Sequence, residues 1–183
     1  GSGRAVLFDE SGAEISASSQ EWWHATDPRY PGSMDFDTAG NWAALARCCR
    51  EVIATSGVDP KDIKAVSATA MREAFVLHDQ TGTEIWACAN VDARASDEVR
   101  ALKTSHPDLE RDIYTRSGQT YALGALPRLI WLRKHMPDVL EHAQSLTMLS
   151  DWVLYRLSGA LSSEPSNAGT TGLIGLADRA PLR

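Results

Sequence analysis

An arginine and a glutamate stand side by side at positions 72 and 73, and this pair is the sharpest chemical feature of the sequence. A guanidinium donates hydrogen bonds and a carboxylate accepts them, so Arg72 and Glu73 together could hold several hydroxyl groups of a sugar or polyol. An ordinary surface ion pair would show the same two residues and contribute little to stability. Spacing alone favours the ion pair, and both interpretations stay open.

Asn90, Asp92 and Arg94 form a second polar cluster. An amide and a carboxylate at the rim of a sheet suit a polar small molecule. Asp92 could equally be the N-cap of the helix that follows, and Arg94 a solvated residue of its first turn.

The chain starts with Gly1, Ser2, Gly3 and Arg4. Glycines let backbone N–H groups approach an anion closely, so Arg4 could meet a phosphate here. A Gly-Ser start is also a common remnant of cloning, which makes the pattern weak support for a phosphate site.

The histidines and cysteines give no metal-ligand spacing, so we expect no metal site in these residues. The three cysteines are expected to be reduced thiols. Cys48 and Cys49 are neighbours on a predicted helix and cannot easily bridge each other, and Cys49 falls on the apolar face of that helix.

Strands are expected to position the two polar clusters. The apolar run Ile63–Ala70 predicts a buried strand that ends at the Arg72–Glu73 pair. The runs 74–77 and 84–89 predict two further strands around a turn, the second of which ends at Asn90. We therefore expect both clusters at neighbouring strand ends, facing a common hollow.

The remaining periodicity predicts an alternation of strands and helices. Residues 38–56 form the clearest helix, capped by Asp37 or Thr38 and ended by Gly57, and a strand on either side of it would give an α/β crossover. Other expected elements are a hairpin over 1–9 and 13–23, helices over 96–104, 107–115, 125–135 and 152–157, a short helix from Pro137, strands over 146–149 and 173–176, and a loop over 162–172.

Composition excludes several classes of protein. The chain has 183 residues and a net charge of −6, with a pI near 5.3, so nucleic acid or an anionic membrane is not the expected partner. No apolar run approaches the roughly 20 residues that span a bilayer, and no signal-peptide pattern opens the chain. The expected location is the cytoplasm.

Six segments occur in an order that is typical of one protein family. These segments are PGSMDFD at 31–37, MRE at 71–73, NVDAR at 90–94, PRLIWL at 127–132, SDWVLYRLSG at 150–159 and SEPSNAGTTGL at 163–173. By these segments the sequence resembles the FGGY carbohydrate kinases, with Asp35, Asn90 and Arg128 standing where the family usually carries glutamate, tryptophan and lysine. GSGRAVLFDESG at 1–12 is similar to the end of the family's opening phosphate loop.

The resemblance implies an α/β, ribonuclease-H-like (actin-like ATPase) fold with a mixed sheet flanked by helices. Residues 1–183 would be part of the N-terminal domain, without its first strand, the catalytic aspartate region and the C-terminal nucleotide domain. The missing central strand would leave backbone groups of both its neighbours unpaired. A chain this short is expected to be part of a longer protein or a poorly behaved fragment.

The resemblance also implies ATP-dependent phosphorylation of a primary hydroxyl, with Mg²⁺ bridging the phosphates. Arg72, Glu73, Asn90 and Asp92 would bind the substrate, and Gly1, Ser2, Gly3 and Arg4 would face the nucleotide. No catalytic residue is expected here, because the family's catalytic aspartate would lie beyond Arg183.

The segments WACANVDARA and SNAGTTGL most resemble the autoinducer-2 kinases of bacterial quorum sensing, which act on a linear dihydroxy-diketone. A pentulose or polyol kinase for xylulose, erythritol or glycerol is the alternative, followed by a non-catalytic sugar-binding module and an actin-like scaffold. A homodimer is a possible assembly under each of these functions.

Overall fold

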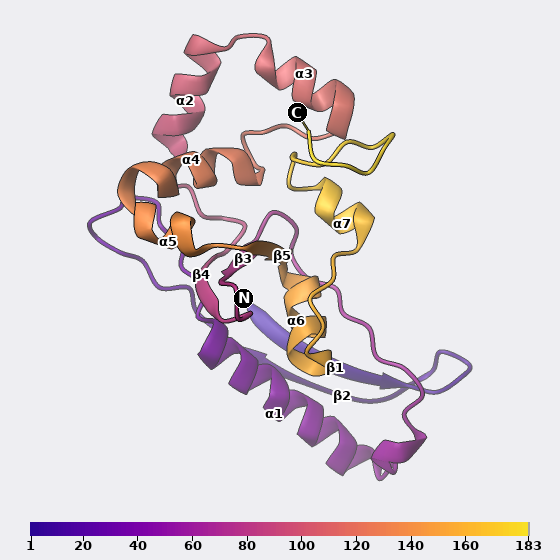
Figure 1. The fold of residues 1–183 in the computed structure, drawn as a ribbon. Helices are drawn as coiled ribbons and strands as arrows, with labels where there is room; N and C mark the ends of the chain where they lie inside the picture. The colour runs from indigo at the N-terminus through magenta and orange to yellow at the C-terminus, as the bar shows by residue number, and fades with distance from the viewer. Residues whose placement is uncertain (183) are drawn as a thin grey trace. The chain divides into compact units, whose positions relative to one another are not determined.

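The computed structural model describes residues 1–182, and the chain divides into two compact units (Figure 1). The first unit comprises Gly1–Ala25 and Phe36–Ser67. The second comprises Thr26–Asp35 and the chain from Ala68 onward.

The first unit opens with an antiparallel hairpin, as the sequence predicts. Strands β1 (Ser2–Phe8) and β2 (Glu14–Glu21) pair with Gly3 opposite Gln20. The Asp9 carboxylate closes the turn by accepting hydrogen bonds from the backbone N–H groups of Ser11 and Ala13, at 2.8 and 2.9 Å.

Helix α1 (Thr38–Ser56) packs against both strands and has the predicted ends. Asp37 caps it, with Oδ1 accepting from the N–H of Gly40 at 2.9 Å, and Gly57 ends it with a φ of 70°.

The predicted apolar face of α1 is only partly right: Val52 is buried as predicted, but Asn41, Ala44 and Cys48 are buried in place of Trp42, Leu45 and Cys49. The fully buried cysteine is Cys48, whereas Cys49 is only partly covered, and the stripe that packs on the hairpin also contains small residues such as Ala44. Small side chains let the helix come close to the strands: the Cys48 thiol reaches the carbonyl of Gly3 at 3.8 Å. Close approach therefore outweighs hydrophobic size in choosing the face. The predicted face was Trp42, Leu45, Cys49, Val52 and Ile53.

The predicted buried strand Ile63–Ala70 is wrong. After a 3₁₀ turn, η1 (Pro60–Asp62), this stretch forms no strand, and Val66 is 64% exposed. A strand requires a neighbour for its N–H and C=O groups, and no described part of the chain pairs with these residues. The expected strand–helix–strand crossover is not formed for the same reason.

The second unit is built on a three-stranded antiparallel sheet. Strand β3 (Phe75–His78) lies between β4 (Glu84–Cys88) and β5 (Ser145–Met148). All of β3 is buried, as expected for a central strand covered on both faces. The core around the sheet contains Phe75, Leu77, Cys88, Ala95, Ala125, Trp131, Leu132 and Met148.

Five helices of the second unit follow the predicted pattern closely. They are α2 (Ser96–Ser105), α3 (Leu109–Ser117), α4 (Ala125–His135), α5 (Pro137–His142) and α6 (Leu149–Ser158). A sixth helix, α7 (Pro165–Gly169), was not predicted.

Three local predictions in this unit need correction. Ser150 and Asp151 lie inside α6, whose N-cap is Met148. The predicted loop 162–172 contains α7, which Glu164 caps by accepting from the N–H groups of Ser166 and Asn167. The predicted strand 173–176 is reduced to a single bridge between Ile174 and Pro181, because no second strand continues the pairing.

Candidate functional site

The two predicted polar clusters meet at one end of the β3–β4 hairpin. Arg72 and Glu73 come just before β3, and Asn90 follows β4. Because the strands are antiparallel, with Phe75 opposite Cys88, the start of β3 lies beside the end of β4. The hairpin brings these residues together, and the expected strand 63–70 has no part in it.

Three polar side chains at this hairpin end have no partner in the described chain. Arg72 is exposed, and Glu73 and Asn90 are partly exposed. No hydrogen bond or ion pair of these side chains occurs among residues 1–182, and Arg72 and Glu73 do not pair with each other. A guanidinium, a carboxylate and an amide are therefore available to an external ligand.

Glu73 has an unusual backbone conformation. Its φ is 64°, in the left-handed region that residues other than glycine avoid at a cost of about 1–2 kcal/mol. Such conformations persist where the surroundings enforce them, and they cluster at ligand-binding and active sites.

The side chain of Arg128, on α4, ties the loops of the site together from within the protein. Arg128 is only 5% exposed. Its Nη1 donates to the carbonyl of Glu73 at 2.6 Å and more weakly to that of Leu123 at 3.5 Å. Its Nη2 donates to the carbonyls of Asn90 and Asp92 at 2.9 and 3.0 Å. One guanidinium thus binds the loops on both sides of the hairpin end.

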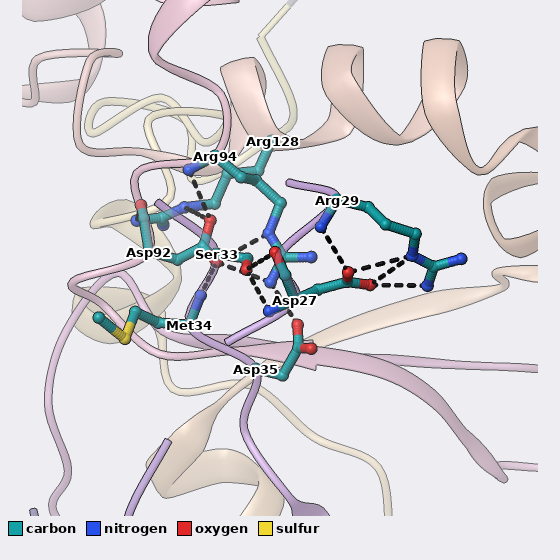
Figure 2. Close-up of polar contacts among 8 residues, drawn as sticks. All are labelled: Asp27, Arg29, Ser33, Met34, Asp35, Asp92, Arg94 and Arg128. Carbon is teal, nitrogen blue, oxygen red and sulfur yellow. Dashed lines mark hydrogen bonds and ion pairs between the residues drawn. The ribbon is translucent and has the colours of Figure 1, made fainter. Parts of the chain in front are cut away.

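Asp92 is not placed as a substrate ligand. Its carboxylate has no exposed surface, and Oδ2 accepts from the backbone N–H of Met34 at 2.6 Å and from Nε of Arg94 at 2.7 Å (Figure 2). The alternative role as a helix cap is also wrong, because the cap of α2 is Ala95. The expectation of a direct substrate contact is corrected: Asp92 holds neighbouring protein groups.

Arg94 is not the solvated residue that the sequence suggested. Its side chain is 2% exposed, forms ion pairs with Asp92 and Asp35, and lies 5.2 and 5.1 Å from the ring centres of Trp86 and Trp131. Burial alone would lower the pKa of the guanidinium, but the hydrogen bonds that Arg94 donates to Asp92 and Asp35 outweigh burial and raise this pKa. The two indole faces add cation–π attraction.

Backbone hydrogen bonds join the 31–35 segment to the 89–93 segment. The N–H of Ala89 donates to the carbonyl of Met34 at 2.9 Å, and that of Ala93 donates to Gly32 at 2.8 Å. Gly32 has a φ of 83°, and an added Cβ would lie 3.1 Å from the Ala93 carbonyl carbon. A glycine is needed here for the two segments to approach.

The loop that leads into this junction is closed by its own polar residues (Figure 2). The Asp27 carboxylate accepts from Nε and Nη2 of Arg29, with the shortest contact at 2.6 Å, and these hydrogen bonds lower the pKa of Asp27. The N–H of Asp27 donates to the hydroxyl of Ser33 at 2.7 Å. The loop therefore presents Met34 and Asp35 in a fixed arrangement.

Gly1, Ser2, Gly3 and Arg4 do not form the expected phosphate loop. Ser2, Gly3 and Arg4 belong to β1 and pair with β2, and Gly1 exchanges backbone hydrogen bonds with Trp22.

The glycines at the chain start have a packing role instead. A Cβ on Gly3 would lie 2.4 Å from the Trp22 ring, so the close indole requires a glycine there. Arg4 is exposed and pairs with Glu14 at 3.4 Å. These residues, as arranged, do not fit a nucleotide phosphate.

No group of three His, Cys, Asp or Glu side chains in the described part of the chain could hold a metal ion, so no residue is assigned to Mg²⁺. Within residues 1–182, none of the helices combines the length and apolar character that crossing a membrane requires.

A hollow of about 370 Å³ lies at the opposite, turn end of the β3–β4 hairpin. It therefore does not coincide with the hollow that we expected beside Arg72 and Asn90. Its lining is Gly82, Thr83, Glu84, Tyr155, Arg156 and Gly159.

Sequence reasoning missed the roles of Arg128 and Arg94. One feature of the sequence could have indicated that Arg128 is buried: it is the only charged residue in the apolar run 125–132 of a predicted helix. A charge in that position requires buried partners, although it does not say which.

A comparison with protein families matches residues 1–180 to the N-terminal domain of the FGGY family of carbohydrate kinases. Among curated proteins, the chain is 49% identical to an autoinducer-2 kinase from Salmonella choleraesuis (strain SC-B67), and 50% identical to one from Escherichia coli O9:H4 (strain HS). Both alignments cover 180 residues, which are 98% of this chain and 34% of each relative. The chain thus spans about a third of the length of these relatives.

Solved structures show the same fold at low sequence identity. A ligand-bound xylulose kinase from Lactobacillus acidophilus matches 100% of this chain and 36% of its own, with a TM-score of 0.87 and 18% identity. Plasmodium falciparum glycerol kinase with ADP matches 98% of this chain and 37% of its own, with a TM-score of 0.83 and 18% identity. The expected α/β fold of the actin-like ATPases is confirmed.

Proposed function

Because this chain belongs to the FGGY family of carbohydrate kinases, we propose that it supplies the acceptor-binding part of an ATP-dependent kinase. The reaction is the transfer of a phosphoryl group to a primary hydroxyl of a small sugar-like substrate. The proposed acceptor is the linear autoinducer-2 precursor, since relatives about half identical to this chain carry the name autoinducer-2 kinase.

One observation carries this proposal: Arg72, Glu73 and Asn90 are gathered at one end of a hairpin, and their polar groups have no partner among residues 1–182. In this proposal the Arg72 guanidinium donates to a hydroxyl or ketone oxygen of the acceptor. The Glu73 carboxylate accepts from a hydroxyl, and the Asn90 amide does either. The left-handed backbone at Glu73 is what a preorganised binding residue would show.

Asn90 supports a polar acceptor. An amide at this position is small and offers both a donor and an acceptor, whereas an indole there would offer an apolar wall. A dihydroxy-diketone has an oxygen on most of its carbons, so a polar amide beside it matches its chemistry. The alternative acceptors xylulose, erythritol and glycerol have an oxygen on every carbon and match the amide equally, so the preference for the linear precursor rests on the names of the relatives.

Phosphoryl transfer depends mostly on positioning and charge stabilisation. ATP with Mg²⁺ would supply the phosphoryl group and neutralise the charge that develops on it. The residues of this chain take the other part, which is to hold the acceptor and fix the direction of its hydroxyl. The proposed location of this activity is the cytoplasm, where ATP is available.

The test is a coupled assay of the full-length protein with ATP and Mg²⁺ against four acceptors: the linear autoinducer-2 precursor, xylulose, erythritol and glycerol. We expect the highest kcat/KM with the linear precursor. Preference for another acceptor would correct the substrate, and acceptor binding without ATP turnover would replace the kinase by a sugar-binding module.

A further inference from the structure

Arg128 occupies a position that its own helix does not favour. It is the fourth residue of α4, near the end where the helix dipole repels a cation, and α4 has no acidic residue in its first turn. A buried guanidinium in such a place requires compensation from other acceptors.

Backbone carbonyls provide most of that compensation. Two of them, those of Glu73 and Asn90, belong to residues whose side chains are unpartnered at the candidate site. A third belongs to Asp92, whose carboxylate also lies 3.9 Å from Nε of Arg128. The guanidinium of Arg128 therefore fixes the distance between the loop of Glu73 and the loop of Asn90 and Asp92. It does so from within the protein, away from the exposed side chains of the candidate site.

The bond to Glu73 bears on the direction of its side chain. At 2.6 Å it is the shortest of the four hydrogen bonds that Arg128 donates, and it holds the carbonyl of a residue with a left-handed backbone. If the carbonyl is released, Glu73 can leave the left-handed region by rotation about its N–Cα and Cα–C bonds. Rotation about the N–Cα bond would redirect the Glu73 carboxylate relative to Arg72.

We propose that Arg128 is a positioning residue, which sets the geometry of Arg72 and Glu73 relative to Asn90 and thereby the affinity for the acceptor. The proposal rests on the proposed function of these three residues. Arg128 itself touches no substrate, because it is buried beneath the loops.

The test replaces Arg128 in the full-length protein by Lys, Gln and Met, which offer progressively fewer hydrogen-bond donors. We expect the KM for the acceptor to rise in that order, by about tenfold or more for Arg128→Met, with the KM for ATP unchanged. Arg128→Lys should keep most of the wild-type affinity. Arg133→Met, at an exposed position of the same helix, is the matched control and should behave as wild type.

Hydrogen–deuterium exchange of the same variants gives a readout that does not depend on activity. In Arg128→Gln we expect faster exchange at 72–75 and 90–94, and unchanged exchange in α1. If all variants lose kcat and thermal stability together while the acceptor KM stays at the wild-type value, Arg128 is merely structural and the proposal fails.

The proposal and the proposed function can fail separately. If the wild-type protein phosphorylates none of the acceptors, the proposed function fails, and exchange alone then decides the role of Arg128. Faster exchange confined to residues 72–75 and 90–94 supports the positioning role of Arg128, and unchanged exchange in these residues overturns that role.

Discussion

Three arginines of the second unit show how burial decides what one side chain does. Arg72 is exposed and has no side-chain partner in the described part of the chain, so its guanidinium is available to a ligand. Arg94 is enclosed by two carboxylates and two indoles, and Arg128 is enclosed by carbonyls. The sequence shows the same residue type three times, and only the tertiary contacts separate a binding group from two groups that fix loops.

Cys88 gives a prediction for pH dependence. Complete burial raises the pKa of its thiol from 9.0 to about 12. The folded state then keeps the proton while the unfolded chain loses it above pH 9.0, so the stabilising contribution is full below pH 9.0 and is lost as pH rises towards 12.

We expect the free energy of unfolding of the wild-type protein to fall more steeply above pH 9 than that of Cys88→Ala, since only the wild type has this thiol to titrate. Urea unfolding followed by circular dichroism between pH 8 and pH 10.5 measures both curves. Parallel curves would show that Cys88 does not have the raised pKa.

At the scale of elements, the local signals in the sequence were sufficient for most helices and for the two hairpins. Caps and glycine stops mark the ends of α1, and short apolar runs mark β3 and β4. Two predicted strands, 63–70 and 173–176, failed because these apolar runs have no partner strand within residues 1–182. The predicted loop 162–172 failed because it contains α7. The strand propensity of a segment shows only that it can form a strand. Whether the strand forms depends on a neighbouring strand that pairs with it.

Asp37 tests the capping argument for α1. Asp37→Ala removes the acceptor for the N–H of Gly40, and we expect the free energy of unfolding to fall by about 1 kcal/mol. Asp37→Asn keeps an oxygen in the same place and should retain most of the stability. Equal losses in the two variants, measured by urea unfolding, would mean that the cap is not what stabilises the helix end.

At the scale of the whole molecule, segments far apart in the sequence converge on one set of contacts in the second unit. Residues 32–35, 73, 90–94 and 128 meet through hydrogen bonds and ion pairs. Figure 2 shows the part of this network that involves Met34, Asp92 and Arg94. The sequence resemblance named these segments as family features. It assigned Asp92 to the substrate and gave Arg128 no role, because a motif does not say which of its groups face inward.

The central claim is that Arg72, Glu73 and Asn90 hold the phosphoryl acceptor. Its most direct test is the steady-state kinetics of Arg72→Ala in the full-length protein, with Arg111→Ala, at an exposed position on α3, as the control. Loss of a charged hydrogen bond predicts an acceptor kcat/KM about tenfold to a hundredfold below wild type, with the KM for ATP unchanged. An Arg72→Ala enzyme with the wild-type kcat/KM for the acceptor would contradict the account.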